Sequence, residues 1–196
     1  MNFLALLLFL VPGSDALKDP SQATLTAPET FKVRFTTSKG DVVISVTRAW
    51  SPFGADRFYN LVKAGYFDRV PFYRVVPGFV TQFGFHPDPQ VNRAWNEAKI
   101  LDDASYKSNY RGTIVFATAG PNTRTCQFFI NTVDNLNLDA MGFTPFGEVS
   151  EGMDVVENIF SGYGQNPNQT QIRENGAAYL NANFPDMDYI LSAKVE

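Results

Sequence analysis

The 196-residue sequence has one cysteine, Cys126, and one histidine, His86. A single cysteine excludes an intrachain disulfide, and the pair supplies too few ligands for a zinc site of cysteine and histidine. No metal or other cofactor is therefore expected. His86 lies in the turn-rich stretch His-Pro-Asp-Pro, which predicts a solvent-exposed side chain and not an acid–base catalyst. Cys126 precedes an apolar run, which predicts a small buried or half-buried thiol, with redox sensing as the alternative.

Charged residues are also scarce. They make up 18% of the chain, the net charge is −4, and no basic run occurs. A protein that binds nucleic acid usually carries a basic patch, so a nucleic-acid partner is not expected. The adjacent carboxylates Asp102 and Asp103 lie in a polar stretch. They are expected in a solvated turn, and a paired-carboxylate catalytic site is the alternative.

An apolar run near the N-terminus, Phe3–Val11, is too short to cross a membrane, since a spanning helix needs about 20 residues. It suits the apolar region of a signal peptide, although no lysine or arginine precedes it. Small residues at Ser14 and Ala16 predict cleavage after Ala16. An uncleaved anchor or a wrongly assigned start are the alternatives. We expect a mature form that does not span the membrane and enters the secretory pathway, whether secreted, periplasmic or in an endomembrane lumen.

Aromatic residues, by contrast, are plentiful at 14% of the chain, and 18 of them are phenylalanine. This length and composition suit one domain with a substantial core. Residues 17–30 are polar with two prolines and predict a linker, so the domain is expected to span 31–196. The sequon that starts at Asn168 would be glycosylated only in a host that glycosylates.

Hydrophobic patterning predicts mostly strands. The expected strands are Phe31–Thr36, Val42–Val46, a pair within Phe72–Gln82 that breaks at Pro77–Gly78, Gly112–Ala117, Gln127–Asn131, Phe146–Val149 and Tyr189–Val195. Two helices are expected, one that Ser51 caps and that Gly65 ends, and one over Met153–Phe160. Residues 86–111 are polar and predict a long surface excursion.

About eight strands without regular crossover helices predict a mainly β protein. The expected fold is an eight-stranded closed antiparallel β-barrel capped by two α-helices. Side chains fill the interior of a barrel of this size, so a binding site is expected on its outer wall. A barrel that carries a small apolar ligand inside is the disfavoured alternative.

The stretch Phe72–Phe85, FYRVVPGFVTQFGF, holds one charge, Arg74, and one amide, Gln82. Taken alone, Arg74 would be a strand residue with its charged end in solvent. The aromatic residues around it, taken alone, would be core residues. Arg74 could also be a cation held against an apolar surface, and the surrounding motifs favour this second interpretation.

Four segments in order, FYRVVPGFVTQFG, GTIVFATAGPNTRTCQFFIN, LDAMGFTPFGEV and EGMDVVENI, resemble the cyclophilin family of peptidyl-prolyl cis-trans isomerases. The resemblance covers about Phe31 to the C-terminus. It implies a barrel capped by two helices and an outer groove for an extended proline-containing peptide. It also implies an isomerase of the EC 5.2.1.8 type that acts, as a monomer, on proline-containing peptides and unfolded protein clients.

The resemblance assigns roles to individual positions. It places the catalytic arginine at Arg74 and the amide that orients it at Gln82. The implied substrate-binding positions are Phe79, Val80, Phe129, Leu138 and Phe143 in a proline pocket, Ala117, Thr118 and Ala119 along the peptide backbone, and Gln127 nearby. The family more often has asparagine where Thr118 stands and histidine where Phe143 stands. Asn137 replaces the tryptophan of cyclosporin-sensitive members, so weak inhibition by cyclosporin is expected.

Arginine suits this chemistry because its guanidinium is always protonated and rigid. In a half-rotated prolyl bond the nitrogen lone pair becomes localised and accepts a hydrogen bond, which stabilises the twisted state over the planar one. The alternative function is a non-catalytic module, a chaperone or assembly factor, that holds proline-containing segments in the same groove.

Overall fold

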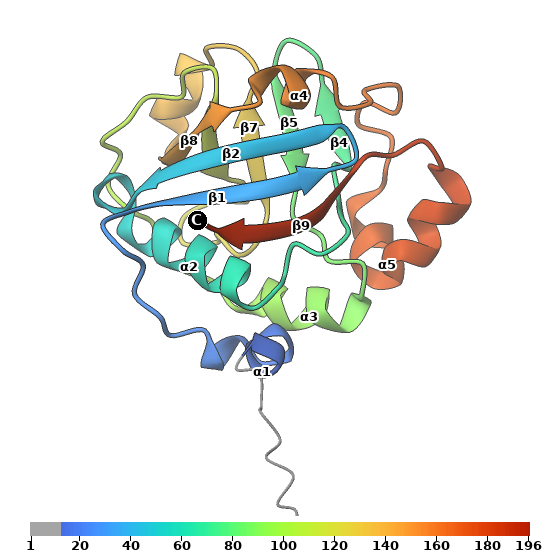
Figure 1. Cartoon of the computed structure of the whole chain (residues 1–196), viewed down its shortest axis with the longest axis horizontal. Helices are drawn as coiled ribbons and strands as arrows, with labels where there is room; N and C mark the ends of the chain where they lie inside the picture. The colour runs from blue at the N-terminus through green and yellow to red at the C-terminus, as the bar shows by residue number, and fades with distance from the viewer. Residues whose placement is uncertain (1–12) are drawn as a thin grey trace, which may run out of the picture.

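A computed structural model describes residues 13–196 of the chain (Figure 1). The expected signal peptide, residues 1–16, lies almost wholly outside these residues, so its cleavage stays a prediction. Within the described part, no helix combines the length and apolar character that crossing a membrane requires.

The described residues form one antiparallel sheet in which nine strands follow the order β3-β9-β1-β2-β8-β6-β7-β5-β4. The strands are β1 Thr30–Thr37, β2 Gly40–Thr47, β3 Val70–Pro71, β4 Arg74–Val76, β5 Val80–Phe83, β6 Thr113–Phe116, β7 Phe128–Asn131, β8 Pro145–Glu151 and β9 Tyr189–Val195. All of the pairings are antiparallel. The expected mainly β, antiparallel architecture is therefore confirmed.

The sheet is curled, but it is not the closed eight-stranded barrel that was expected. Its two ends are β3 and β4, and no ladder joins them. These strands follow each other along the chain with only Phe72 and Tyr73 between them, and each pairs with a different strand, β3 with β9 and β4 with β5. Phe72 N–H donates to the carbonyl of Asp188, the residue before β9, whereas Val75 N–H donates to the carbonyl of Gly164, in a loop.

The helices outnumber the two that were expected. They are α1 Gly13–Lys18, α2 Pro52–Lys63, α3 Pro89–Glu97, α4 Met153–Glu157 and α5 Gln169–Asn183. In Figure 1, α2 and α3 lie below the strands and α5 lies to the right. Short 3-10 helices cover Pro20–Gln22, Arg48–Trp50 and Leu136–Met141. The expectations of a helix after Ser51 and of one from Met153 are confirmed, the latter ending early at Glu157.

The segment 86–111 was expected to be a surface excursion, and part of it is instead helical and buried. Asp88 caps α3 by accepting from Gln90 N–H at 2.8 Å. Trp95 of α3 is completely buried and joins the main core. His86 is only 8% exposed, so the expectation of a solvent-exposed histidine is wrong. The polar composition hid a helix that buries one face only.

Phenylalanine side chains fill the space inside the curled sheet. Phe128 on β7 lies 4.4 Å from Phe116 and 5.6 Å from Phe58 of α2, measured between ring centroids. Phe35 of β1 contacts the same cluster through Phe58 and Phe83. These rings are completely or almost completely buried. A packed aromatic interior leaves the outer faces of the strands for binding, in agreement with the sequence analysis.

Residues 17–30, which were expected to be a linker, are attached to the helices in the structure. The carbonyl of Leu17 accepts from Trp95 Nε1–H of α3 at 2.9 Å. Further along, Leu25 N–H donates to Asn60 Oδ1 at 3.0 Å and Ala27 N–H donates to an Asp56 carboxylate oxygen at 2.8 Å, both on α2. The segment therefore packs along the domain.

Candidate active site

Four side chains lie in one row across neighbouring strands. Arg74 on β4 is opposite Gln82 on β5, and Gln82 is opposite Phe129 on β7. Phe129 is in turn opposite Val115 on β6. Side chains alternate between the two faces of a sheet. The residues that follow these four in sequence, Val75, Phe83, Ile130 and Phe116, belong to the interior core. The row itself therefore faces outward.

An apolar notch of about 250 Å³ opens on this outer face. It is lined by Arg74, Phe79, Val80, Gln82, Ala117, Thr118, Phe129, Leu138, Met141 and Phe143. Phe129 and Phe143 meet edge to face with their ring centroids 5.6 Å apart. The notch brings together all seven residues that the sequence assigned to catalysis and the proline pocket. Met141 is an addition that the sequence analysis missed.

The guanidinium of Arg74 stands at the edge of the notch. Its Cζ lies 5.7 Å from the centroid of the Phe79 ring. Its Nη1 donates to Gln82 Oε1 at 3.2 Å, while Nε and Nη2 donate to Gln165 Oε1 at 3.0 and 2.8 Å. Both acceptors are neutral amides, and none of the ion pairs between described residues includes Arg74. No carboxylate among the described residues therefore offsets the positive charge of Arg74.

Gln165 was missed in the sequence because its contact depends on a loop that folds back over 91 residues of chain. The carbonyl of Gly164 accepts from Val75 N–H at 3.2 Å, which attaches the loop between α4 and α5 directly beside Arg74. Gly164 adopts φ +53°, a left-handed conformation that glycine accepts without strain. No local sequence pattern signals this contact.

The remaining predicted positions extend beyond the notch. Ala117 and Thr118 line both the notch and an adjoining pocket, whereas Ala119 and Gln127 line only that pocket. The Thr118 hydroxyl donates to the carbonyl of Gly120 at 2.5 Å, within its own loop. The same hydroxyl accepts from Gly120 N–H at 3.2 Å, so the Thr118 side chain is engaged within its loop.

Buried asparagines connect the two sides of the notch. Asn135 Nδ2 donates to the carbonyl of Phe79 at 3.0 Å and to Asn131 Oδ1 at 2.7 Å. Asn131 Nδ2 donates in turn to Asn109 Oδ1 at 3.1 Å, and Asn109 Nδ2 donates to the carbonyl of Phe143 at 2.8 Å. Asn109 and Asn131 are completely buried. Such a satisfied network fixes the spacing of the aromatic walls.

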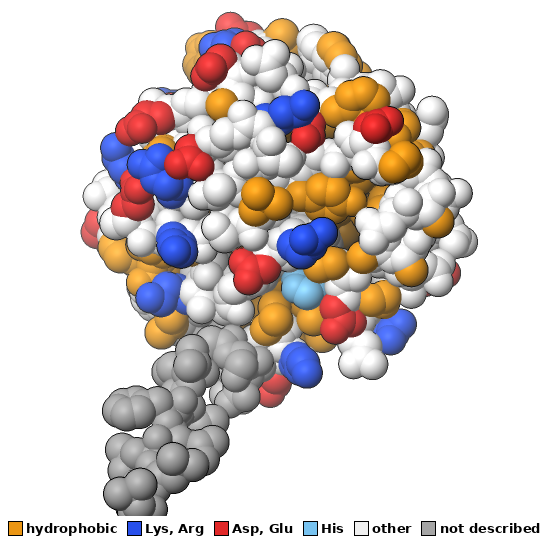
Figure 2. All heavy atoms as spheres, turned by 45° about the vertical axis from the view of Figure 1, so that its right-hand side comes forward, with side chains coloured by type: hydrophobic (Ala, Val, Ile, Leu, Met, Phe, Trp, Pro, Cys, Tyr) orange, Lys and Arg blue, Asp and Glu red, His pale blue; other side chains and the backbone are white. Residues whose placement is uncertain are grey.

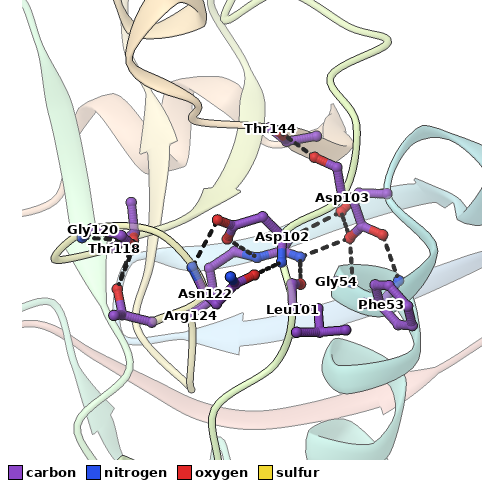
Figure 3. A network of polar contacts seen from close by, with 12 residues as sticks. Phe53, Gly54, Leu101, Asp102, Asp103, Thr118, Gly120, Asn122, Arg124 and Thr144 are labelled. Atoms are coloured by element: carbon purple, nitrogen blue, oxygen red, sulfur yellow. Dashed lines mark hydrogen bonds and ion pairs between the residues drawn. The ribbon is translucent and has the colours of Figure 1, made fainter.

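A second polar network holds the loop between β6 and β7 against α2 (Figure 3). Asp103, expected in a solvated turn, has a side chain only 4% exposed and forms an ion pair with Arg124 at 2.9 Å. It also accepts from Phe53 N–H and Gly54 N–H at the start of α2, both at 3.0 Å. Asp103 thus caps α2, a role that the sequence assigned to Ser51. The solvated-turn prediction is wrong for Asp103.

The two rarest residue types lie away from the notch. Burial lowers the pKa of His86, whose main-chain N–H and C=O both bond to the Asn92 amide. Burial likewise raises the pKa of the Cys126 thiol, which lies 3.1 Å from Tyr66 Oη. The expectation of a buried Cys126 is confirmed. Among residues 13–196, no cluster of three or more side chains of metal-binding type occurs.

The histidine gives a prediction for pH dependence. Because the pKa of His86 is lower in the folded state than its usual value near 6.5, the unfolded state binds the extra proton first. The free energy of unfolding is therefore expected to fall as pH drops below about 6.5. Catalysis is expected to stay nearly constant from about pH 6.5 to 8, since no group lining the notch titrates there.

Thermal unfolding and kcat/KM, each measured from pH 5 to 8, would check this pH dependence. The variant His86→Gln should lose the stability change between pH 5 and 6.5 and keep its activity. A bell-shaped activity profile centred near pH 7 would contradict the expectation, because it would point to an acid–base group.

The surface in one view carries charges of both signs. On the face shown in Figure 2, lysine and arginine side chains are interspersed with aspartate and glutamate among polar and hydrophobic ones. This face shows no extended basic area of the kind that tracks a phosphate backbone. A small cationic site set in an apolar notch suits a neutral substrate that develops a hydrogen-bond acceptor.

Comparison with known proteins agrees with this geometry. The family model "Cyclophilin type peptidyl-prolyl cis-trans isomerase/CLD" matches residues 32–176. Peptidyl-prolyl cis-trans isomerase B of Escherichia coli (strain K12) is 36% identical over 135 residues, which cover 65% of this chain and 82% of that protein. An isomerase of Acinetobacter baylyi is 36% identical over 133 residues, 65% and 70% of the two chains.

A solved structure shares the fold. The cyclophilin type peptidyl-prolyl cis-trans isomerase of Cryptosporidium parvum superimposes with a TM-score of 0.65 at 22% sequence identity, over 85% of this chain and 98% of that one. A second crystal structure of that protein, in the presence of the dipeptide ala-pro, gives a TM-score of 0.64 at the same identity, over 84% and 98%.

Proposed function

The chain belongs to the cyclophilin-type peptidyl-prolyl cis-trans isomerase family, and from this premise we propose that Arg74 and Gln82 accelerate rotation about Xaa-Pro bonds held in the notch. The observation that carries the proposal is the fixed guanidinium of Arg74 at the edge of an apolar cavity. The proline ring would occupy the cavity formed by Phe79, Phe129 and Leu138. Proline-containing peptides and unfolded protein clients are the proposed substrates.

The mechanism follows from the electronic structure of the peptide bond. Rotation about it crosses a barrier of about 18–20 kcal/mol because delocalisation of the nitrogen lone pair is lost. At the twisted geometry the nitrogen becomes pyramidal and accepts a hydrogen bond, which Arg74 donates. No covalent step or proton transfer is needed, because the arginine only binds the twisted state more strongly than the planar one.

The side-chain amides of Gln82 and Gln165 do not use all of the hydrogen-bond donors of Arg74. A guanidinium has five N–H groups, of which three point to Gln82 and Gln165 in the structure. One N–H on each terminal nitrogen therefore remains for the substrate. A net gain of about 1.5–3 kcal/mol for one charge-assisted hydrogen bond corresponds to roughly 10- to 150-fold in rate. Desolvation in the apolar notch adds to this.

Gln165 is proposed as a positioning residue that acts through Arg74. Replacing Gln165 by alanine is expected to lower kcat about 10-fold with little change in KM, because Arg74 loses two of its three restraints while the proline pocket stays intact. Steady-state isomerisation kinetics would check this split between kcat and KM. Asn166→Ala, a neighbouring exposed amide, is the matched control and should behave like the wild type.

The positioning role of Gln165 would be contradicted if Gln165→Ala raised KM alone, or if its kcat stayed within twofold of the wild-type value. Unchanged thermal unfolding is expected for both variants because both side chains are exposed. This distinguishes a positioning role from a structural one.

A coupled isomerisation assay on a short Xaa-Pro peptide tests the proposed function. Acceleration of cis-to-trans exchange by the wild-type protein is expected. Uncatalysed exchange takes tens to hundreds of seconds, so the effect is easily followed. Binding of the peptide without acceleration would instead indicate a non-catalytic module, an alternative that the family relationship does not favour.

The proposal extends to where and how the protein acts. We propose that residues 1–16 direct the chain into the secretory pathway and that the mature protein acts there as a monomer, supported by the short apolar run Phe3–Val11. Weak inhibition by cyclosporin is proposed because Asn137 is exposed and absent from the lining of the notch.

We propose in addition that β3 and β4 act as one bent strand. In support, β3 pairs with β9 at one end of the sheet and β4 pairs with β5 at the other, with only Phe72 and Tyr73 between them. Counted this way, the sheet would be an eight-stranded barrel that closes through the covalent chain.

A further inference from the structure

A second pocket, of about 360 Å³, adjoins the notch and shares Gln82, Ala117 and Thr118 with it. We call it the side pocket. Its inner wall is the loop between β6 and β7, and its outer wall comes from Asn96 on α3 and from Gln169 and Arg173 on α5. The sequence analysis foresaw neither of these helices. The wall that these helices form, with Asn96, Gln169 and Arg173, was therefore not part of the predicted site, although the facing residues Ala119 and Gln127 were.

The position of α5 is set by its contact with the segment that precedes α3. Gly176 interrupts α5 with φ +53°, and a Cβ atom there would lie 2.1 Å from the carbonyl oxygen of Pro87. Ala177 N–H donates to that same carbonyl at 3.0 Å. Only glycine allows so close an approach. The first half of α5, which carries Arg173, is thereby held beside α3.

Arg173 is the one formally charged side chain among the described residues that line the side pocket. Its Nη1 lies 3.5 Å from Asn96 Oδ1, a weak contact with a neutral group. Glu97 and Glu174 line an adjoining recess together with Arg173. None of the ion pairs among residues 13–196 includes Arg173, however. The pocket thus presents a cation that lacks an anionic partner in the described chain.

The other lining groups suit a bound peptide. Thr125 and Gln169 line the same space with a hydroxyl and an amide group. The side-chain oxygen of Gln127 is buried and has no hydrogen-bond partner within residues 13–196. A buried acceptor without a partner is costly. A main-chain N–H of a substrate that passes between the notch and the side pocket would satisfy it.

We propose that the side pocket selects substrates with an aspartate or glutamate side chain within two residues of the proline, through an ion pair with Arg173. This inference rests on the proposed function, since it places the proline in the notch. An extended peptide advances about 3.3 Å per residue and its side chains alternate in direction. A residue one or two positions from the proline therefore reaches a pocket that shares a wall with the notch.

The test compares peptides that differ only in one side chain. Glutamate, glutamine or lysine is placed one or two residues before or after proline, and kcat/KM and binding affinity are measured for each peptide. At the best position, kcat/KM and binding affinity are expected to be about 3- to 5-fold higher for the glutamate peptide than for the glutamine peptide, the size of effect that a partly exposed ion pair gives. The lysine peptide is expected to have the lowest values. The preference should shrink in 0.5 M salt, because screening weakens exposed ion pairs.

Two variants with the same change in charge distinguish a local effect of Arg173 from a general effect of the net charge of the protein. Arg173→Glu is expected to invert the preference, so that the lysine peptide exceeds the glutamate peptide. Lys63→Glu, on the exposed face of α2 and outside both pockets, should keep the wild-type order. Thermal unfolding of both variants would show that the fold is intact.

Equal values for the glutamate and glutamine peptides with the wild type would overturn the inference. So would a glutamate preference that survives in Arg173→Glu. If no peptide were isomerised faster than in buffer, the proposed function would fail. The ratio of binding affinities would still decide whether Arg173 selects acidic side chains.

Discussion

Replacing Arg74 with alanine is expected to lower kcat/KM for a short Xaa-Pro peptide about 100-fold. This variant removes the only charged side chain that lines the notch within the described chain, and with it the donor to the pyramidal nitrogen. The loss of one preorganised donor in a water-poor site typically costs 10²–10³ in rate. The proline pocket is untouched, so KM and peptide binding should change little. Steady-state isomerisation kinetics and a peptide titration would measure both.

Arg74→Lys separates charge from geometry. Lysine keeps the positive charge but cannot bond to Gln82 and Gln165 at once through a planar fork. Its activity is expected to recover only part of the loss seen with alanine. Both variants should unfold near the wild-type temperature, because Arg74 is half-exposed and bonds only to neutral side chains. An alanine variant within threefold of wild-type activity would refute the assigned role of Arg74.

The second large effect concerns stability. Asp103→Ala is expected to lower the free energy of unfolding by about 3–5 kcal/mol, the cost of removing one partner from a buried ion pair. The variant would leave the Arg124 guanidinium, whose side chain is 5% exposed, without its shortest ion pair. The first N–H groups of α2 would also lose the acceptor that caps them. Chemical denaturation would measure the change.

The adjacent carboxylate is the matched control. Asp102 has a side chain 41% exposed and lies 3.4 Å from Arg124. It also accepts from Asn122 N–H at 2.7 Å. Asp102→Ala is expected to cost about 1 kcal/mol, typical of an exposed pair together with one hydrogen bond. If the two alanine variants lost equal stability, Asp103 could not be the buried anchor that the structure describes.

Part of the site could be predicted from the sequence because its side chains lie on strands, where successive side chains alternate between the two faces of the sheet. The motif around Arg74 and Gln82 lies on two strands joined by the Pro77–Gly78 turn, so the two side chains meet by register. Phe129 follows from the same alternation on β7. The outward direction of the row also follows, because the interior positions are occupied by aromatic side chains.

Contacts between distant segments could not be predicted in this way. Gln165 reaches Arg74 only because a loop attaches to β4, and Asp103 reaches α2 only because the polar segment after α3 folds over it. The burial of His86 likewise depends on its contact with Asn92 on α3. Each of these polar residues lies in a polar stretch, a pattern that usually indicates a solvent-exposed loop. Tertiary contacts override that local pattern here.

The place of β9 in the sheet has a consequence for biosynthesis. This strand, Tyr189–Val195, lies between β1 and β3, so it pairs with residues of β1 made more than 150 positions earlier and with residues of β3 made about 120 positions earlier. Until it leaves the ribosome, the edges of β1 and β3 have no partner and remain open to pairing with other nascent chains. An enzyme of this family, which assists the folding of others, would itself be vulnerable to aggregation until synthesis of its final strand.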